Sequence, residues 1–316
     1  MSVEKPNILL IITDHQAWYN HYLRDEVNYS LPVWEQFTKQ AMNFERAYCV
    51  APICTPARSS MLTGEYPSKH GQVRNFKGVE LNNLSDFRSG QKLYSHYLSE
   101  AGYRNAYIGK WHCGVEKIPI DFGIEGWSVS GYGQPYLTDR YQEYIRDRDL
   151  TPPEGVIEHW LHRSENTGHQ SIVNYLDASG VMDGPKEGHH DHFVSNLAIE
   201  KLEELHQADQ PWSLVASYWG PHHAYFPTAP FADTVDPESI PEHPTFNDDL
   251  TTRPFRHFSH LNSNNSGRAD WPDWSSWQKI LARAYEQQKQ TDDAVGELLH
   301  ALEQSGQADN TLVIWV

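Results

Sequence analysis

The sequence predicts an α/β fold with a mostly parallel central sheet flanked by helices. Short apolar runs alternate along the chain with segments of helical periodicity, which is the order expected when helices connect parallel strands. The first apolar run, at 7–12, is too short for a helix and ends in the polar pair Thr13-Asp14, so a buried strand is expected there. Further strands are expected at 104–108, 212–218 and 311–316.

The helices expected between these strands carry their apolar residues on one stripe. They are expected at 31–42, 93–101, 193–205 and 281–302. Gly102 suits the position just after a helix end, where a left-handed residue is favoured, and Gly306 ends the last helix in the same way.

Two stretches, about 118–188 and 228–274, show neither the pattern of a strand nor that of a helix, and they are rich in Gly, Pro, aromatic and charged residues. Long loops of this kind usually form lids or binding walls. We therefore expect one domain over 1–316 with two irregular insertions, incomplete at its C-terminus because the chain stops inside an apolar strand. Aromatic residues of these stretches are candidates for stacking on a sugar or aryl ring: Trp127, Tyr132, Tyr136, Trp271 and Trp274.

Composition excludes several partners. Asp and Glu outnumber Lys and Arg by 42 to 25, which gives a net charge of −17, and no basic run offers a footprint for nucleic acid. An anionic substrate would need a locally positive pocket. No apolar run approaches the ~20 residues of a membrane span, and no secretory signal is recognisable, so no membrane partner and a cytoplasmic location are expected.

The three cysteines are too few and too irregularly spaced for a disulfide framework or a zinc knuckle. Cys49 and Cys113 are expected to be small buried residues. Cys54 is different, because Pro56 follows it where a helix can begin and Arg58 lies one turn further on. A helix N-terminus with a cation on the same face favours a negative charge at position 54. The alternative is an ordinary buried cysteine before a helix.

Residues 54–58, C-T-P-A-R, followed by Leu-Thr-Gly at 62–64, resemble the signature C-x-P-x-R of the sulfatase family. Three further segments are similar to that family in the same order. The strand at 7–14 resembles one that ends in a metal-binding Asp. Residues 102–112 match G-Y-x-x-x-x-x-G-K-W-H, and residues 221–227 match P-H-x-x-x-x-P.

The resemblance implies a sulfatase domain of the alkaline-phosphatase-like fold that hydrolyses a sulfate ester of a small molecule or carbohydrate. In that family a formylglycine-generating enzyme oxidises the signature cysteine, here Cys54, and the hydrated aldehyde attacks sulfur. Asp14 and position 54 would bind a divalent cation, typically Ca²⁺, with Mg²⁺ or Mn²⁺ as alternatives. His15 is a weaker candidate ligand, standing where many members have a second Asp.

The resemblance also implies the remaining roles. Arg58 would support the deprotonated diol oxygen. Lys110 and His222 would face the sulfate oxygens and the leaving alkoxide, as electrostatic clamp and proton donor. His112 would take the proton of the second hydroxyl, so that the sulfated diol collapses to aldehyde and releases sulfate.

Each of these residues has a structural alternative. Asp14 would otherwise be a helix N-cap, Lys110 a solvated surface charge, and His112 and His222 buried structural histidines. The cluster His189-His190-Asp191-His192 resembles a metal site, but Asp191 is better explained as an N-cap or first-turn acid of the following helix. His223 is expected to be structural, and His70 to fix the loop after the signature helix.

Further metal ligands and a sulfate-binding Lys lie in this family beyond a strand like 311–316. We therefore expect residues 1–316 alone to bind metal poorly and to be nearly inactive. A phosphonate monoester or phosphodiester hydrolase of the same superfamily is the alternative enzyme, and a non-catalytic anion-binding remnant is the third reading.

Overall fold

The computed structural model describes residues 5–17, 24–27, 29–75, 83–131, 133–160, 168–170, 178–248, 252 and 273–316. Its main sheet has the strand order β3-β2-β7-β1-β8, and every neighbouring pair is parallel. These strands are β1 (Asn7–Ile12), β2 (Arg104–Lys110), β3 (Glu125–Val129), β7 (Trp212–Ser217) and β8 (Thr311–Trp315). The parallel sheet predicted from the sequence is confirmed.

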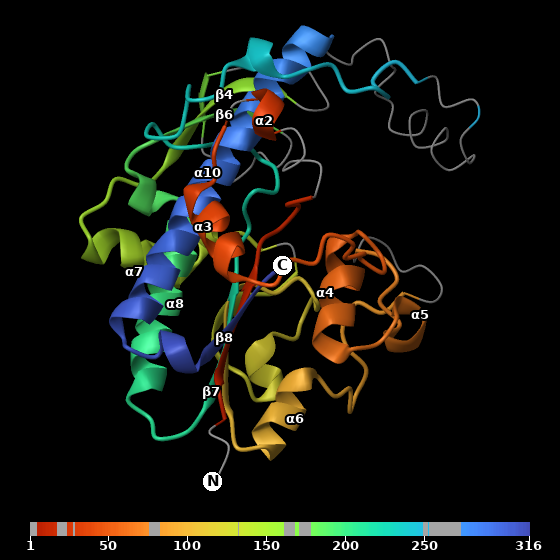
Figure 1. The fold of residues 1–316 in the computed structure, drawn as a ribbon, viewed down its shortest axis with the longest axis vertical. Helices are drawn as coiled ribbons and strands as arrows, with labels where there is room; N and C mark the ends of the chain where they lie inside the picture. The colour runs from red at the N-terminus through yellow and green to blue at the C-terminus, as the bar shows by residue number, and fades with distance from the viewer. Residues whose placement is uncertain are drawn as a thin grey trace.

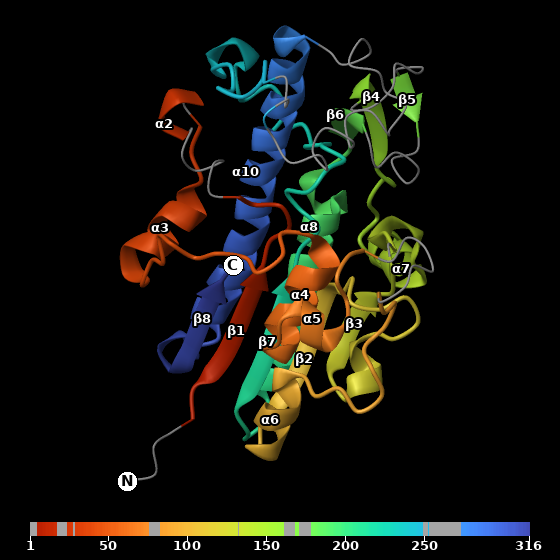
Figure 2. The same cartoon turned by 90° about the vertical axis from the view of Figure 1, so that its right-hand side faces the viewer.

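The helices lie on both faces of this sheet (Figures 1 and 2). They are α2 (Arg24–Val27), α3 (Pro32–Gln40), α4 (Cys54–Thr63), α5 (Pro67–His70), α6 (Tyr94–Glu100), α7 (Asp139–Asp147), α8 (His190–His206) and α10 (Trp274–Gln304). Short 3₁₀ helices occupy Pro119–Phe122, Pro135–Leu137, Lys186–Gly188, Pro237–Ser239 and Ala308–Asn310. In Figure 2, α4, α5 and α6 lie in front of the sheet, and α8 and α10 lie behind it.

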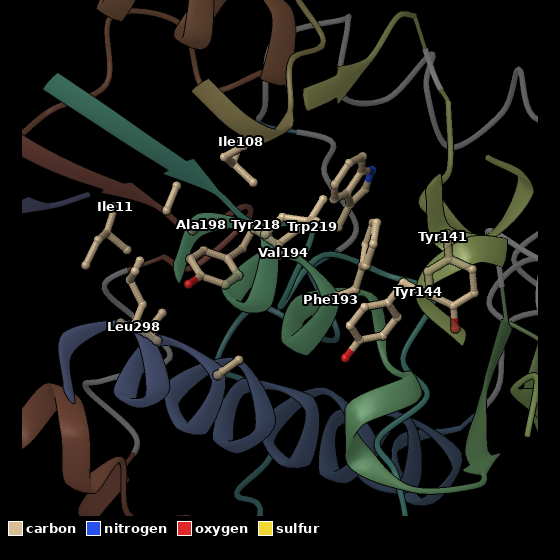
Figure 3. Close-up of a cluster of buried hydrophobic side chains, with 14 of the residues drawn as sticks. Ile11, Ile108, Tyr141, Tyr144, Phe193, Val194, Ala198, Tyr218, Trp219 and Leu298 are labelled. Carbon is tan, nitrogen blue, oxygen red and sulfur yellow. The ribbon is translucent and has the colours of Figure 1, made fainter. Parts of the chain in front are cut away.

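Successive side chains of a strand point to opposite faces of the sheet, so each strand contributes to both apolar layers between the sheet and its helices. In β1, Leu9 and Ile11 belong to one buried cluster, and Leu10 and Ile12 belong to another. The first cluster joins the sheet to α8, α10 and α7, and Figure 3 shows Ile11 and Leu298 at one end of it. Both faces of β1 are therefore buried, which explains its uninterrupted apolar sequence.

The described part of the stretch 118–188 contains regular elements, which corrects the prediction of an irregular insertion there. It contains β3, α7 and a separate antiparallel sheet of β4 (Glu154–Trp160), β5 (Gly168–Gln170) and β6 (Ala178–Asp183), in the order β5-β4-β6. The β3 sequence, EGWSV, has no apolar run because it lies at the edge of the main sheet. The described part of 228–274 before α10 holds one regular element, the 3₁₀ helix Pro237–Ser239.

Among the helices in the described ranges, none combines the length and the apolar character that crossing a membrane requires.

Candidate active site

The candidate site lies at the carboxyl ends of three neighbouring strands of the main sheet. Asp14 follows β1, Lys110 is the last residue of β2, and His222 lies in the loop after β7. The parallel register pairs Leu9 of β1 with Leu214 of β7, so these strands end at the same edge. Ligand sites of open parallel sheets occur at this edge.

Helix α4 brings the signature residues to this edge. It begins at Cys54 and ends at Thr63, and the following cap residue Gly64 has a φ of +69° and donates its N–H to the Ser60 carbonyl. The Thr55 hydroxyl donates to the His112 carbonyl (3.0 Å), which ties the start of α4 to the segment after β2. The helix predicted at Cys54 is present, and its N-terminus faces the strand ends.

Arg58 connects α4 to two strands of the sheet. Its Nη1 donates to the Lys110 carbonyl (2.9 Å) and to the Ser217 hydroxyl (2.7 Å), and its Nη2 lies 3.6 Å from Asp14 Oδ2. The Ser217 hydroxyl in turn donates to the Lys110 carbonyl (2.8 Å). The guanidinium is buried and these contacts hold its charge beside the Asp14 carboxylate.

Asp14 is the centre of the charged cluster. Lys110 Nζ donates to Asp14 Oδ2, and the Cys54 thiol lies 3.8 Å from Asp14 Oδ1. Burial alone would raise the pKa of Asp14, but the positive charges of Lys110 and Arg58 hold that pKa far below its usual range. Burial, and then the Asp14 charge, raise the pKa of the Cys54 thiol. At neutral pH the site therefore holds a carboxylate and a protonated thiol.

His112 and His222 are both neutral at pH 7. Burial, followed by the charge of Lys110, lowers the pKa of each to about 3. His112 has a φ of +54° and is buried directly after Trp111. His15, with a φ of +65°, is exposed and its ring centroid lies 5.5 Å from that of His222.

Gly109 explains why a glycine precedes the site lysine. Its φ is +105°, and a Cβ there would lie 1.9 Å from the Ser217 carbonyl oxygen. Only a glycine allows β2 this approach to β7, so Gly109 is a condition for the position of Lys110.

Three groups of described residues hold possible metal-ligating atoms within 4.8 Å of one another: Asp14, Cys54 and His222; His189, His190 and Asp191; His192, Asp293 and Glu297. In the second group, the Asp191 oxygens already accept hydrogen bonds from Gly220 and Thr291. In the third, Lys186 Nζ lies 2.5 Å from Asp293 and 3.0 Å from Glu297. Of these three groups, only the first includes position 54.

A hard cation such as Ca²⁺ takes six to eight oxygen ligands. Among the described residues, the first group offers one carboxylate, and its Oδ2 already contacts Lys110. Asp14 Oδ1, facing position 54, fits one part of such a coordination shell. His15 does not belong to this group.

Several side chains differ from their expected surroundings. Cys49 is exposed, which corrects the prediction of a buried residue, whereas Cys113 is buried as predicted. The Tyr136 side chain is buried and its hydroxyl forms a hydrogen bond with His190 Nδ1 (2.7 Å). It is therefore not exposed for stacking on a sugar or aryl ring, which corrects the prediction. Trp127 packs against Phe193. Tyr132 and Trp271 lie outside the described residues.

His70 and Asp191 can be compared with their predicted roles. The His70 ring lies 3.0 Å from the Ser60 hydroxyl and accepts from the Gln72 N–H, so it ties α4 to the following loop as expected. The N-cap of α8 is His189, and Asp191 stands in the first turn of that helix. The sequence did not indicate Ser217 as a site residue, because a single serine that belongs to no recognisable motif gives no signal.

A parallel α/β domain with two buried cations and a carboxylate beside a helix N-terminus defines a protein with a buried charged cluster at the carboxyl ends of its strands. The sequence model of the sulfatase family matches residues 6–316, so the chain belongs to the sulfatase family.

Curated relatives agree with this assignment. The chain is 25% identical to an uncharacterised sulfatase, YidJ, of Escherichia coli, over 81% of this chain and 46% of that protein. It is 26% identical to a choline-sulfatase of Rhizobium meliloti, over 75% of this chain and 42% of that protein. An arylsulfatase of Clostridium perfringens is 25% identical, over 99% and 62% respectively. The chain thus spans about half the length of the curated relatives it matches.

Solved structures share the fold. A phosphonate monoester hydrolase of Agrobacterium radiobacter superposes with a TM-score of 0.71 at 18% identity, over 98% of this chain and 62% of that one. The protein titled Ps i-CgsB superposes with a TM-score of 0.61 at 21% identity, over 99% and 58%. The alkaline-phosphatase-like fold expected from the sequence is confirmed.

Proposed function

We propose that this protein hydrolyses a sulfate ester to an alcohol and inorganic sulfate, with formylglycine made from Cys54 as the nucleophilic residue. The observation that carries the proposal is the cluster of Asp14, Lys110 and Arg58 around position 54. The two cations outnumber the carboxylate, so the site is locally positive in a chain whose net charge is −17. Such a site attracts an anion against the overall field.

The chemistry of position 54 supports a modified side chain. Because burial raises the pKa of the Cys54 thiol, the unmodified residue is protonated at neutral pH and is a poor nucleophile. Formylglycine, once formed by a maturation enzyme, supplies a hydrated aldehyde whose hydroxyl can attack sulfur. Asp14 and position 54 would hold a divalent cation, and Ca²⁺, with Mg²⁺ or Mn²⁺ as alternatives, would supply further positive charge there.

The other site residues receive roles that follow from their charges. Arg58 stabilises negative charge at position 54, and Lys110 stabilises the sulfate oxygens. His112 is unprotonated at pH 7, as a general base requires. His222 donates a proton to the leaving oxygen, once the negative charge of the bound sulfate has raised its pKa from about 3.

The alcohol part of the substrate is proposed to be a carbohydrate or another small molecule. Ps i-CgsB has been solved in complex with k-i-k-neocarrahexaose, and another similar structure holds its substrate D-glucosamine-2-N,6-O-disulfate. A phosphonate monoester hydrolase is the second candidate, supported by the TM-score of 0.71 to such an enzyme. The sequence Lys110-Trp111-His112 favours sulfate.

The mass of the peptide that contains position 54 tests the proposal. After co-expression with a formylglycine-generating enzyme, we expect position 54 to carry the aldehyde. The exposed Cys49 in the same digest is the internal control and should remain a thiol. An unmodified thiol at position 54 under these conditions would contradict the proposal and favour a non-catalytic anion-binding protein.

Turnover of an aryl sulfate and an aryl phosphonate by the full-length form of the protein separates the two candidate reactions. We expect faster turnover of the sulfate and its loss in Cys54→Ala. Preferred turnover of the phosphonate would replace the first candidate by the second, and turnover that survives Cys54→Ala would reject both.

A further inference from the structure

The loop that carries His222 is held by side chains of two helices, α8 and α10. This loop, defined here as the His222 loop, comprises residues 218–226 and follows β7. Its first residue donates its N–H to the Ile12 carbonyl (2.8 Å), which continues the pairing of β7 with β1. Beyond Tyr218 the loop leaves the sheet, so other contacts must fix its position.

The peptide groups on either side of Gly220 link the loop to two acidic residues. The Gly220 N–H donates to Asp191 Oδ1 of α8 (3.0 Å), and the Gly220 carbonyl accepts from the Asp14 N–H (2.9 Å). A Cβ at Gly220 would lie 2.0 Å from Asp191 Oδ2 and 2.3 Å from Thr291 Oγ1. The backbone of the loop therefore packs directly on α8 and α10. Gly220 bridges Asp191 and Asp14, because it makes a backbone hydrogen bond to each of them.

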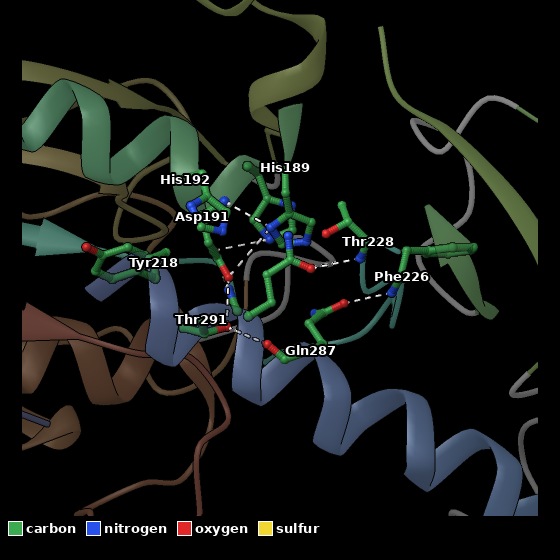
Figure 4. A network of polar contacts seen from close by, with 12 residues as sticks. His189, Asp191, His192, Tyr218, Phe226, Thr228, Gln287 and Thr291 are labelled. Atoms are coloured by element: carbon green, nitrogen blue, oxygen red, sulfur yellow. Dashed lines mark hydrogen bonds and ion pairs between the residues drawn. The ribbon is translucent and has the colours of Figure 1, made fainter. Parts of the chain in front are cut away.

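Gln287 of α10 holds the remainder of the loop at two points. Its Nε2 donates to the His222 carbonyl (2.9 Å), and its Oε1 accepts from the Phe226 N–H (2.7 Å). Thr291, one turn further along α10, donates its hydroxyl to Asp191 Oδ2 (2.8 Å), and that hydroxyl also lies 3.0 Å from the Gln287 carbonyl. Figure 4 shows Asp191, Thr291 and Gln287 as one connected network.

This network is buried. Asp191 and Gln287 are fully buried, and Thr291 is almost so. The charged or titratable groups beside the Asp191 carboxylate are His190, whose Nε2 lies 3.3 Å from Oδ1, and His189, whose Nδ1 lies 3.9 Å from Oδ2. Removal of one member of a buried network leaves its partner without a hydrogen bond. The partner must then move, or the folded state loses the free energy of an unsatisfied buried polar group.

We propose that Asp191, Gln287 and Thr291 are positioning residues, which fix the His222 loop and thereby place the imidazole of His222 against Asp14 and position 54. The proposal rests on the role given to His222 above. It also assigns the His189–His192 segment a structural function, because the Asp191 oxygens are used as acceptors for the loop and for α10.

Gln287→Leu tests the proposal, with Gln290→Leu as the matched control. Both glutamines are buried on α10, and Gln290 Oε1 also accepts a loop N–H, that of Thr228 (2.9 Å), but beyond the His222 loop. A merely structural role predicts similar effects of the two variants. A positioning role predicts that only Gln287→Leu disturbs His222.

Two measurements on the formylglycine-containing full-length protein distinguish these results. The first is the NMR signal of the His222 ring in histidine-labelled protein, assigned with His222→Gln. The second is the division between kcat and KM for 4-nitrophenyl sulfate. We expect Gln287→Leu to shift the His222 signal and to lower kcat by about 10- to 100-fold with KM changed less than about threefold, because small misplacements of a reacting group act on the chemical step. Gln290→Leu should do neither.

Thr291 provides a second variant pair for the case in which Gln287→Leu fails to fold. Thr291→Val keeps the shape and removes the hydroxyl, and Thr291→Ser restores it, so the His222 signal should move in the first and return in the second. Equal His222 signals in wild type, Gln287→Leu and Thr291→Val would overturn the proposal. If the wild type carries formylglycine yet turns over no sulfate ester, the proposed function fails, while the His222 signals still decide the positioning role.

Discussion

Asp14 lies between two cations, and this arrangement sets the chemistry of the site at the level of single residues. Lys110 and Arg58 both contact its Oδ2, so one carboxylate faces two positive charges in a buried environment. In low-dielectric surroundings an uncompensated charge is costly. A bound sulfate group would provide a second negative charge, so the site is electrostatically prepared for an anion before the anion arrives.

Gly109→Ala should destabilise the protein more than a glycine replacement at another left-handed position. The added Cβ would meet the Ser217 carbonyl oxygen at 1.9 Å, and the backbone cannot yield without separating β2 from β7. We expect a loss of roughly 3 kcal/mol in the free energy of unfolding, measured by urea denaturation. Gly123→Ala is the control, since its φ is +71° but a Cβ there meets nothing within 4 Å, and it should cost about 1 kcal/mol. Equal losses would show that strain in φ alone requires glycine at 109.

The sequence could predict the residues that stand in short motifs but not those that act through the fold. Cys54, Arg58 and Lys110 are recognisable because signature residues surround them, and the structure brings them together at Asp14. Gln287 lies 65 residues from His222 along the chain, in an ordinary helix. No local pattern connects them, since only the packing of α10 against the His222 loop does so.

At the level of elements, α10 also completes a helix that cannot cap itself. The N-cap residue of α3 is Leu31, which makes no side-chain cap, and the carboxylate of Asp292 on α10 replaces it. Asp292 Oδ2 accepts from the Val33 N–H (3.0 Å) and Oδ1 accepts from the Trp34 N–H (2.8 Å). These bonds satisfy free N–H groups in the first turn of α3.

Asp292 should make stability depend on pH between about 4 and 6. Burial raises its pKa from 3.8 to about 6, although the two N–H donors oppose the shift. Because the pKa is higher in the folded protein, the folded state retains this proton better, so the group stabilises most below pH 4 and loses that contribution as pH rises through 6. Asp292→Asn should therefore weaken the pH dependence of the free energy of unfolding. The variant should be less stable than wild type at pH 4, and this difference in the free energy of unfolding should shrink by about 2 to 3 kcal/mol from pH 4 to pH 7. Urea unfolding at several pH values measures this, and parallel curves would contradict it.

The elements themselves were predictable where burial on both faces left an unbroken apolar run. The strands β1, β7 and β8 and the helices α6, α8 and α10 lie where their patterns place them. The edge strand β3 and the small antiparallel sheet were missed because their residues are mixed, as in the sequence EGWSV of β3. In β4 the ladder with β6 shifts register between Ile157 and His159, which also interrupts a period-two pattern.

At the level of the whole molecule, the outer edge of the main sheet is apolar and exposed. Within the described residues, β8 pairs with β1 alone, so its other edge has no strand beside it. Val313 and Trp315 pack against the core cluster of α8 and α10. Leu312 and Ile314 point to the opposite face and are 53% and 39% exposed. Both an unpaired edge and an uncovered apolar face are therefore present at β8.

Ile314→Lys should reduce self-association of the chain. An exposed apolar edge strand is a template for pairing with another chain, and a lysine on such a strand opposes that pairing. We expect wild-type protein to show concentration-dependent association in sedimentation velocity and the variant to remain monomeric to higher concentration. Leu137→Lys is the matched control, because Leu137 is 69% exposed but lies in the 3₁₀ helix Pro135–Leu137 and not in a strand. If both lysines reduce association equally, general charge repulsion is the cause; if neither does, the β8 edge does not drive association.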